Sequence, residues 1–599
     1  MTQPERKTVI DTPALIVGAG PAGASLACFL SHPPYSVTGL IVSAAANTSQ
    51  TPRAHIVNPA ALECLRDIGL EEECIKAGTS GDNMMHTRWC HDMTGEEYAR
   101  IYSWGNDPKR KGEYEDATPC KHMDLPQTVL EPILVQRAMS EGWNVRFSVR
   151  FLRFEEDDRG VTSFLIDDVT NTEFLVRSRY LFGCDGARST VLQQLDIPLI
   201  QKPGQGLALN VLVRVNLADF VEARKGNLHW VFQPEKPYPD FAWGGIVRMV
   251  KPWHEWMFIL FPREGIPFTM PTHEQLLDRC RSIVGRDDLP IEILDVSKWH
   301  INEIVAEYYS RGRIFCLGDA VHRHPPFNGL GSNTCIQDAY NLAWKVKLVE
   351  RGAAQMSLLD TYSPERQPVG HGVVTRANQG IRDHLPVWKE LGLLEQMPAE
   401  RVESMRQLRD ATPKGRARRE RLYSAIEATS HEFHALGIEM NHRYSSNAVL
   451  SGDEKPGTLP TMEPNDAILH YRCSTWPGSR LPYVWLNTRI PQKHHCSTLD
   501  LAGHGAFCIL TGIGGDPWKE AAAKVAQQLD VKVRAYSIGW GQDYEDVYRD
   551  WERKREVAED GCILIRPDRY IAWRSMDMIE DCENRLRSAL ETILGRNLP

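Results

Sequence analysis

The sequence predicts an α/β fold that is interrupted by an antiparallel β-sheet and followed by a smaller α/β unit. Three observations carry this prediction. A strand, a glycine-rich turn and a helix follow one another at residues 13–32, an order typical of an open parallel sheet. Apolar and polar residues alternate between about residues 200 and 300, as in an antiparallel sheet. At residues 451–466 the composition shifts to glycine, proline and polar residues, which predicts a linker.

Size and composition are those of an ordinary globular protein. The chain has 599 residues, enough for about two to four domains, and 42% of them are apolar. The net charge is −9, and a local basic run, Pro413–Leu422, is predicted to be a solvated helix face. A nucleic-acid-binding protein would need a concentrated basic face, so we expect no nucleic-acid partner.

Cysteine usage and targeting features favour a cytoplasmic protein. The 14 cysteines are scattered without a Cys-x-x-Cys pair, which favours buried thiols in a reducing compartment over a disulfide framework. The N-terminus has no secretory pattern, and no apolar run approaches the roughly 20 residues of a membrane helix. We therefore expect a soluble, cytoplasmic protein with no membrane partner.

The first motif is Gly18-x-Gly20-x-x-Gly23, which directly follows the apolar run Ala14–Val17 and opens a helical pattern. The first glycine permits a tight turn, the second lets a pyrophosphate approach the backbone, and the third lets helix and strand pack closely. The motif therefore predicts a Rossmann-like dinucleotide site, without separating NAD from FAD. The second strand ends in Ser43 rather than the usual Asp or Glu, and a serine bonds a ribose more weakly than a carboxylate.

A second motif, Asp185-Gly186, follows the short strand Tyr180–Phe182 and precedes Arg188 and Ser189. Asp-Gly is a general turn signal. Taken alone, this motif favours an ordinary turn over a binding site.

A third motif combines a carboxylate, a proline pair and a glycine-rich helix start within residues 312–334. Asp319 stands at the C-terminal end of the strand Ile314–Leu317, on the edge where ligands bind in open α/β sheets. A carboxylate there can accept hydrogen bonds from the hydroxyls of a sugar alcohol chain. Gly329 and Gly331 expose N–H groups at the next helix start, which favours negative charge on a ligand.

Histidines in and after this motif raise the possibility of a metal site. His322 and His324 are spaced i, i+2, and no Cys or Glu completes a ligand set. The histidines of residues 493–496 are predicted to lie in an exposed loop. We therefore expect no metal.

Together the three motifs resemble the single-component FAD-dependent aromatic hydroxylases, which are flavoprotein monooxygenases. The family pattern is an N-terminal GxGxxG, a mid-chain DG, and a GD before a proline and a GxG helix start. The chain is most similar to the branch that contains the phenol and dichlorophenol monooxygenases, and the resemblance spans nearly the whole chain. The supporting segments are Thr51–Leu70, Asp124–Leu134, Val247–Trp256 and Gly318–Thr334.

The resemblance implies a domain order. A Rossmann-like FAD-binding domain occupies residues 10–200 and 301–450, the latter with added helices, and is interrupted by an antiparallel substrate-binding sheet at 201–300. A linker at 451–466 leads to a thioredoxin-like C-terminal domain at 467–599. Because Cys508 has no cysteine partner three residues away, this domain is expected to be structural or dimer-forming, not a thiol exchanger. A homodimer or homotetramer is expected.

The resemblance also implies cofactor contacts. Asp319 would contact the ribityl hydroxyls, and a helix N-terminus would stabilise the anionic reduced flavin. Ser43 remains the ribose candidate. The other implied FAD residues are Gly18, Gly20, Pro21, Ala22 and Gly23 at the pyrophosphate, Arg53 and Gln127, Gly329, Leu330, Gly331, Ser332 and Asn333 at the pyrimidine edge, and Asp185, Gly186, Arg188 and Ser189 for FAD and NADPH handling.

The implied reaction is hydroxylation of a phenolic ring, ortho to its hydroxyl. NADPH reduces the flavin, O2 forms a C4a-hydroperoxyflavin, and this species transfers oxygen to the small aromatic substrate. A phenol reacts best when ionised, and His55 is the candidate base, with a structural histidine as the equal alternative. Arg248 would hold the phenolate or NADPH, or be a solvated strand residue. Trp253 and Trp256 would line the pocket or pack in a core.

Two other functions stay open at this point. The same cofactor chemistry supports Baeyer–Villiger insertion or epoxidation of a polyketide-like substrate. A non-catalytic flavin-binding protein is the third possibility, although the intact Asp319, Gly329 and Gly331 argue against it.

Overall fold

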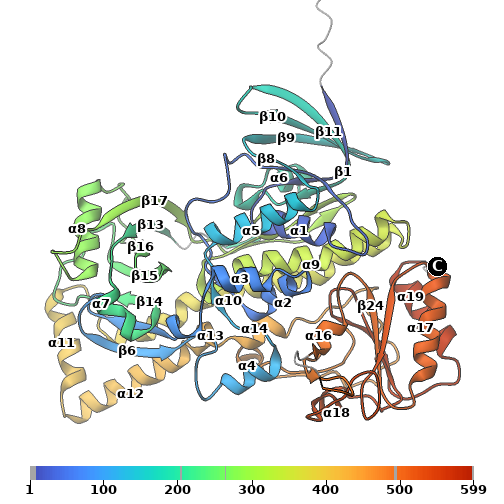
Figure 1. Cartoon of the computed structure of the whole chain (residues 1–599). Coiled ribbons are helices and arrows are strands. Elements are labelled where there is room, and N and C mark those ends of the chain that lie inside the picture. The colour runs from blue at the N-terminus through green and yellow to red at the C-terminus, as the bar shows by residue number, and fades with distance from the viewer. Residues whose placement is uncertain (1–7, 203–205, 264, 492–495, 597–599) are drawn as a thin grey trace, which may run out of the picture.

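The computed structural model describes residues 8–202, 206–263, 265–491 and 496–596, and has a mixed α/β fold with several sheets (Figure 1). A parallel sheet with its helices occupies the centre, an antiparallel sheet lies to one side of it, and the C-terminal part lies to the other (Figure 1). Part of the 493–496 stretch lies outside the described residues.

The central sheet contains parallel strands that are apolar and buried on both faces. Parallel sheets are typically covered on both faces in this way. Its helices α1 (Pro21–Ser31), α5 (Gln127–Ser140) and α9 (Gly331–Glu350) pack together, with α1 against both of the others. The strand order is β19 (Ser310–Arg311), β20 (Ile314–Cys316), β11 (Thr172–Gly183), β1 (Val9–Val17), β2 (Gly39–Val42), β8 (Asn144–Arg146), with β9 (Val149–Asp157) and β10 (Gly160–Asp167) extending it beside β11.

The register of this sheet aligns the ends of its strands. Val17 pairs with Val42 on one side and with Gly183 on the other, and Gly183 pairs with Cys316. All four strands are parallel, so their carboxyl ends lie in one row. The three motifs and Ser43, each of which follows one of these strands, therefore meet at one edge of the sheet.

A second sheet carries seven strands within the described residues. Its order is β17 (Glu292–His300), β13 (Leu207–Arg214), β16 (Glu255–Phe261), β15 (Gly244–Lys251), β14 (Gly226–Val231), β5 (His86–Cys90), β6 (Glu97–Tyr102). The antiparallel pattern expected between residues 200 and 300 is present, but β5 and β6 come from residues 86–102, outside the predicted range. β5 adds to β14 in parallel, a long-range pairing that no local pattern indicates.

One face of this second sheet is closed by α8 (His273–Val284). A capping box formed by Thr272 and Gln275 starts this helix, and its apolar side packs on a core that includes Trp253 and Trp256. These two tryptophans therefore pack in this core, on the side of the sheet that α8 covers. The opposite face contributes Trp89, Trp230 and Ile246 to a second apolar core, which also includes the helical residues Val387 and Ile426.

Short elements connect the two sheets. They are β3 (Ile56–Val57), β7 (Met123–Asp124) and β4 (Thr79–Ser80), which pair in that order, and β12 (Leu199–Gln201), β18 (Ile304–Ala306) and β21 (His322–Arg323), which pair likewise. This part of the chain also has the short helices α2 (Pro59–Asp67), α3 (Glu71–Ala77), α4 (Lys111–Ala117), α6 (Thr190–Leu195) and α7 (Ala218–Val221).

The helices expected within residues 301–450 continue beyond α9. It comprises α10 (Tyr362–Glu390), α11 (Pro398–Arg409), α12 (Pro413–Ala428), α13 (Ser430–Phe433) and α14 (Leu436–Met440). The basic run in α12 is not simply solvated: Arg418 donates to the Glu390 carbonyl and Arg419 to the Leu408 carbonyl, near the C-terminal ends of α10 and α11. Cations are favourable at helix C-termini.

The C-terminal part has a four-stranded sheet of order β25 (Val533–Ser537), β24 (Phe507–Thr511), β26 (Cys562–Ile565), β27 (Ile571–Ser575). Its other elements are α15 (Pro464–Leu469), β22 (Trp485–Leu486), β23 (Cys496–Ser497), α16 (Thr498–Leu501), α17 (Asp516–Leu529), α18 (Asp550–Lys554) and α19 (Cys582–Ile593). The segment predicted to be a linker contacts this sheet. Asp453 accepts a hydrogen bond from Trp573 Nε1 at 2.7 Å, and Glu454 forms an ion pair with Arg574.

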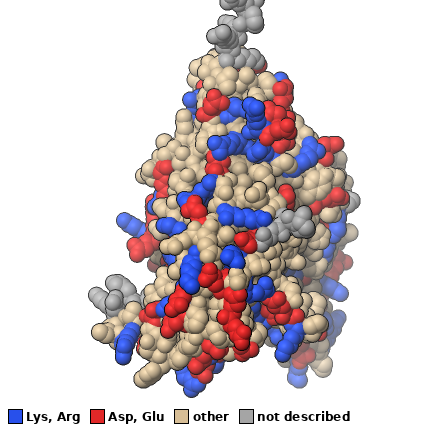
Figure 2. All heavy atoms as spheres, turned by 90° about the vertical axis from the view of Figure 1, so that its right-hand side faces the viewer, with Lys and Arg blue, Asp and Glu red and all other residues tan. Residues whose placement is uncertain are grey.

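Acidic and basic side chains are interspersed on the face of the molecule that Figure 2 shows. No helix in the described ranges is long and apolar enough to cross a bilayer.

Candidate active site

The glycines of the first motif differ in what surrounds them. A Cβ on Gly18 (φ 110°) would lie 2.1 Å from the Cys184 carbonyl oxygen, and one on Gly23 would lie 2.0 Å from the Gly18 oxygen. A Cβ on Gly20 would have Glu131 Oε1, at 3.7 Å, as its nearest neighbour. Gly20 is also the N-cap of α1 and supplies no side-chain cap. The first and third glycines thus serve packing, whereas the second leaves open space before the uncapped N–H groups of α1.

This contrast gives a paired prediction for Gly20→Ala and Gly23→Ala. Gly23→Ala is expected to lower the thermal unfolding midpoint, because its methyl group would collide with backbone. Gly20→Ala is expected to fold normally and to weaken binding of a dinucleotide, because its methyl group enters the open space. Thermal melts and FAD titrations of both variants check this. An unchanged FAD affinity for Gly20→Ala would contradict the placement of the pyrophosphate.

Asp319 and the start of α9 face the same edge. Asp319 is exposed in a 3-10 turn directly after β20. The N-terminus of α9, at Gly331, has no side-chain cap, so the N–H groups of its first turn remain available to a ligand. A Cβ on Gly331 would have only the His324 ring nearby, at 3.7 Å. Ser332 and Leu330 are buried beside it.

The side chain of Asn333 is hydrogen-bonded within the protein. Its side chain accepts from Asn58 N at 3.0 Å and donates to the Ile56 oxygen at 2.9 Å and the Gly329 oxygen. These bonds tie β3 to the start of α9. Only the main chain of Asn333 is left for a ligand.

The loop after β2 is held on the segment before α5. Gln127 N donates to the Ala54 oxygen at 2.8 Å, and Leu125 N donates to the His55 oxygen at 2.7 Å. The Gln127 side chain donates to buried Glu131, which also accepts from Ser49 N at 2.6 Å. Glu131 is a residue that sequence reasoning missed: it orients Gln127 and faces Gly20.

The remaining predicted cofactor residues lie at or near the same edge. Asp185 accepts from Thr190 N at 2.7 Å and Val191 N at 3.2 Å, so in this structure its carboxylate caps α6, and burial raises its pKa. Gly186 has a positive φ, 73°, and Arg188 and Arg53 are exposed. Ser43 Oγ accepts from Ala45 N at 3.3 Å.

The two predicted catalytic residues meet around a third residue, Asp124. Arg248 Nη2 donates to Asp124 Oδ2 at 3.1 Å, and His55 Nδ1 lies 3.7 Å from Asp124 Oδ1. Asn227 Nδ2 also donates to Oδ2, at 2.9 Å. Pairing of β3 with β7 brings His55 beside Asp124, and β15 supplies Arg248 from the second sheet. Asp124 was missed as a site residue, although it lies three positions before Gln127.

Three polar atoms of this cluster are buried without a hydrogen-bond partner in the described residues: His55 Nδ1 and Asp124 Oδ1, which face each other at 3.7 Å, and Arg248 Nε. Buried polar atoms are seldom left unpaired, and such exceptions call for a specific explanation. The cluster therefore has capacity for further hydrogen bonds.

The electrostatics of the cluster suit proton transfer. Burial lowers the pKa of His55, and the Arg248 guanidinium lowers it further. Burial alone would raise the pKa of Asp124, but Arg248 and His55 outweigh it and the pKa is lowered. The cluster at neutral pH therefore holds a neutral imidazole, a carboxylate and a guanidinium.

Replacing Arg248 by methionine should lower the free energy of unfolding. Asp124, with 2% of its side chain exposed, would lose its cation, and such a loss in a buried pair typically costs about 3–5 kcal/mol. The pKa of Asp124 should rise. Denaturant unfolding at pH 5 and pH 8 measures both effects. Arg150→Met, which breaks a surface pair with Asp168, is the control and should leave the midpoint unchanged.

Aromatic side chains surround the cluster. The guanidinium of Arg248 lies 5.9 Å from the centroid of the Trp104 ring, and Trp104 Nε1 donates to Asn227 Oδ1 at 3.2 Å. Trp230 and Phe327 belong to the same apolar cluster as Trp104. Buried aromatic side chains thus lie beside the polar groups.

The histidines of the third motif are engaged within the protein. His322 Nε2 lies 2.9 Å from Asp338 Oδ2, and His324 Nδ1 lies 2.7 Å from the Pro325 oxygen. Neither arrangement is that of a metal ligand set, and no cluster of three metal-binding side chains occurs in the described ranges.

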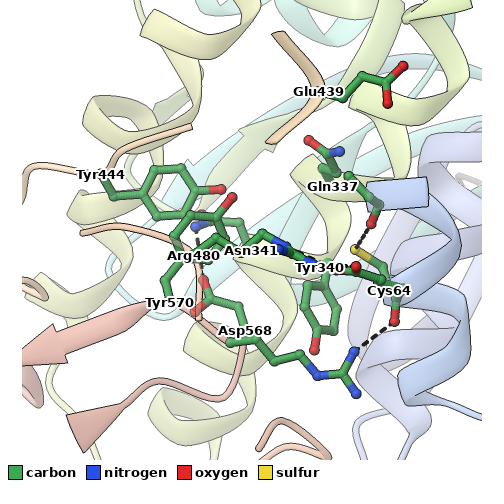
Figure 3. A pocket seen from close by; sticks show the side chains of 12 residues that line it. Cys64, Gln337, Tyr340, Asn341, Glu439, Tyr444, Arg480, Asp568 and Tyr570 are labelled. Carbon is green, nitrogen blue, oxygen red and sulfur yellow. Dashed lines mark hydrogen bonds and ion pairs between the residues drawn. The ribbon is translucent and has the colours of Figure 1, made fainter. Parts of the chain in front are cut away.

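A small cavity of about 40 Å³ lies elsewhere, between α2, α9, α14 and the C-terminal part (Figure 3). Arg480, Asp568 and Tyr340 line it, among others. It is smaller than the apolar cavity of about 150 Å³ that accommodates benzene in a protein core. We therefore do not place the substrate there.

Comparison with known proteins agrees with this geometry. Residues 11–377 match the FAD binding domain family, and residues 474–597 match the family of aromatic-ring hydroxylase C-terminal domains. The chain is 41% identical to 2,4-dichlorophenol 6-monooxygenase of Cupriavidus pinatubonensis, covering 98% of this chain and 97% of that protein. It is 38% identical to phenol 2-monooxygenase of a Pseudomonas species, with coverages of 98% and 93%.

A solved structure is equally similar. The flavin-dependent monooxygenase PieE, in complex with FAD and substrate, superposes with a TM-score of 0.92 and is 38% identical over 98% of this chain and 99% of that one. Both matched parts of the chain thus belong to one kind of enzyme. The protein belongs to the FAD-dependent aromatic-ring hydroxylases, enzymes that use FAD and O2 as monooxygenases.

Proposed function

We propose that this enzyme hydroxylates a phenolic substrate ortho to its hydroxyl group, with NADPH as the reductant. The observation that carries the proposal is the buried cluster of His55, Asp124 and Arg248, which joins an unprotonated base to a cation beside aromatic side chains. The names of the two relatives place the new hydroxyl at position 6 of 2,4-dichlorophenol and at position 2 of phenol, both ortho.

The chain's residues fit FAD at the edge of the central sheet. The open space at Gly20 and the uncapped start of α1 suit a pyrophosphate, exposed Asp319 suits the ribityl hydroxyls, and the start of α9 suits the negatively charged pyrimidine end. Gln127, held by Glu131, is a further contact. Bound FAD would accept electrons from NADPH and activate O2 for transfer to the ring.

The cluster would prepare the substrate. Arg248 attracts the phenol oxygen, and neutral His55 takes its proton, which makes the ring electron-rich. Asp124 then stabilises the imidazolium that forms, as a buried carboxylate does for a paired histidine. The aromatic and apolar wall excludes water, which otherwise diverts the activated oxygen to hydrogen peroxide.

The same proposal assigns roles to the parts of the chain. The second sheet, residues 201–300 with β5 and β6 added, binds substrate, and residues 10–200 and 301–450 bind FAD. The C-terminal part is a thioredoxin-like domain: one parallel and two antiparallel pairings in the order β25-β24-β26-β27 support this. Burial raises the pKa of Cys508 to about 12, which favours a structural role for this domain over thiol exchange. The enzyme is proposed to be a cytoplasmic homodimer or homotetramer.

A substrate screen tests the function. Phenols, ketones and polyketides are offered to the FAD-loaded enzyme, and NADPH oxidation is scored against product mass. Hydroxylated phenols with matching NADPH consumption are expected. Ester or epoxide products would replace this proposal with Baeyer–Villiger or epoxidising chemistry, and phenol-independent NADPH oxidation would favour a protein that binds flavin without hydroxylating.

A further inference from the structure

A line of buried polar side chains begins at the turn that carries Asp319. Asp338 in α9 accepts through Oδ2 from Gly318 N at 3.2 Å and lies 2.9 Å from His322 Nε2. Its other oxygen, Oδ1, accepts from Arg366 Nε of α10 at 2.7 Å. Asp338, His322 and Arg366 are each 0% exposed. One carboxylate thus joins the turn, α9 and α10.

The line continues toward the C-terminal part. Arg366 Nη1 donates to the Tyr444 hydroxyl at 3.0 Å, and the Tyr444 ring stacks on Tyr570 with centroids 4.1 Å apart. Figure 3 shows these two tyrosines beside the small cavity. Tyr570 lies directly before β27. The cofactor edge is therefore connected to the C-terminal sheet through four side chains.

A buried ion pair is weak evidence of a stabilising role, because desolvation offsets much of its attraction. Burial alone would raise the pKa of Asp338, yet Arg366 and His322 lower it, so the group is a carboxylate. Unlike a packed apolar side chain, this carboxylate can accept a hydrogen bond from the Gly318 amide. Gly318 has a φ of 63°, its Cβ position is 2.8 Å from Cys335 Sγ, and it directly precedes Asp319.

We propose that Asp338 is a positioning residue for FAD binding: it fixes the Gly318 amide and so sets the direction in which Asp319 presents its carboxylate. Arg366 holds Asp338 in place, and Tyr444 and Tyr570 tie this arrangement to the C-terminal part. The inference rests on the proposed contact between Asp319 and the ribityl chain of FAD.

The experiment separates positioning from stability. The full-length double variant Asp338→Leu/Arg366→Met removes both charges of the ion pair, so neither stays buried without the other. Replacing both partners by apolar groups can be nearly neutral for folding stability. The Gly318 amide, His322 and the Tyr444 hydroxyl lose a partner, but no charge of the pair stays buried alone, so the thermal midpoint of the FAD-free double variant should fall less than that of Asp338→Leu alone. Its dissociation constant for FAD, from quenching of flavin fluorescence, should rise about tenfold or more, the usual worth of a lost bond to a charged group.

Lys345→Met is the matched control. Lys345 is also in α9, also 0% exposed, and is paired with Glu365 at 2.8 Å, but has no bond to the Gly318 turn. Its variant should lose thermal stability and keep wild-type FAD affinity. If FAD affinity falls equally in Lys345→Met, the effect of Asp338 is general destabilisation and the inference is wrong.

Two other results decide the remaining cases. A folded double variant with wild-type FAD affinity overturns the inference. Should the double variant fail to fold, Asp338→Asn decides by the same comparison, since its amide disrupts the bond to Arg366. Asp319→Ala distinguishes failure of the proposed cofactor contact from failure of the positioning role. If Asp319→Ala binds FAD with wild-type affinity, the proposed contact between Asp319 and FAD is wrong. If Asp319→Ala loses FAD affinity and the Asp338 variants keep it, only the positioning role of Asp338 is rejected.

Discussion

Replacing His55 by alanine is expected to lower kcat for phenol hydroxylation by about 100- to 10,000-fold, the usual worth of a general base. The substrate would remain a neutral phenol, whose ring is a poorer nucleophile. FAD content should be unchanged, because His55 is assigned to the substrate and not to the cofactor. Steady-state kinetics that count hydroxylated product, not NADPH oxidation, measure the effect, since uncoupled turnover also consumes NADPH.

The pH profile gives a second signature of the same base. His55 must be neutral to accept a proton, and its pKa lies below the ordinary 6.5, so the rate should fall only as the pH drops below about that value through the lowered pKa. His55→Ala should lose this acid limb. His442→Ala is the control, since burial also lowers the pKa of His442, to about 3, in a place away from the cluster. A wild-type profile in His55→Ala would show that His55 is structural.

The second large effect is expected for Asp319→Ala, in the affinity for FAD. Hydrogen bonds to a charged group are worth about 1.5–3 kcal/mol, so the dissociation constant should rise roughly tenfold to a hundredfold. The FAD-free protein should melt as wild type does, because Asp319 is exposed. Asp11→Ala removes an exposed carboxylate near the other end of the same sheet, in β1, and should have no effect. Full FAD occupancy in Asp319→Ala at limiting FAD would refute the assignment.

Local patterns predicted the edge of the central sheet at which the three motifs meet. Each motif follows a short apolar strand, and parallel strands bring their carboxyl ends to one edge, so Gly18 and Asp319 could be placed together before the structure was known. The register confirms this, with Val17, Gly183 and Cys316 in one row. The family membership, which rested on these motifs, is confirmed by the comparisons.

Long-range contacts were predicted less well. Asp124 becomes part of the cluster only because β3 pairs with β7 and the second sheet brings Arg248 to the same place, and neither event leaves a local sequence signal. The addition of β5 to β14 was missed for the same reason. The hydrogen bonds of the Asn333 side chain to Asn58, Ile56 and Gly329 are likewise long-range or loop contacts that no local pattern indicates.

The most direct test of the whole account is the fate of labelled oxygen. The FAD-loaded enzyme is given NADPH, ¹⁸O2 and the best phenol from the substrate screen, and the product is analysed by mass spectrometry together with the NADPH consumed. The account predicts a catechol that carries one labelled oxygen, ortho to the original hydroxyl, and NADPH consumption equal to product. Hydrogen peroxide without labelled catechol, at a rate that no phenol changes, would contradict it.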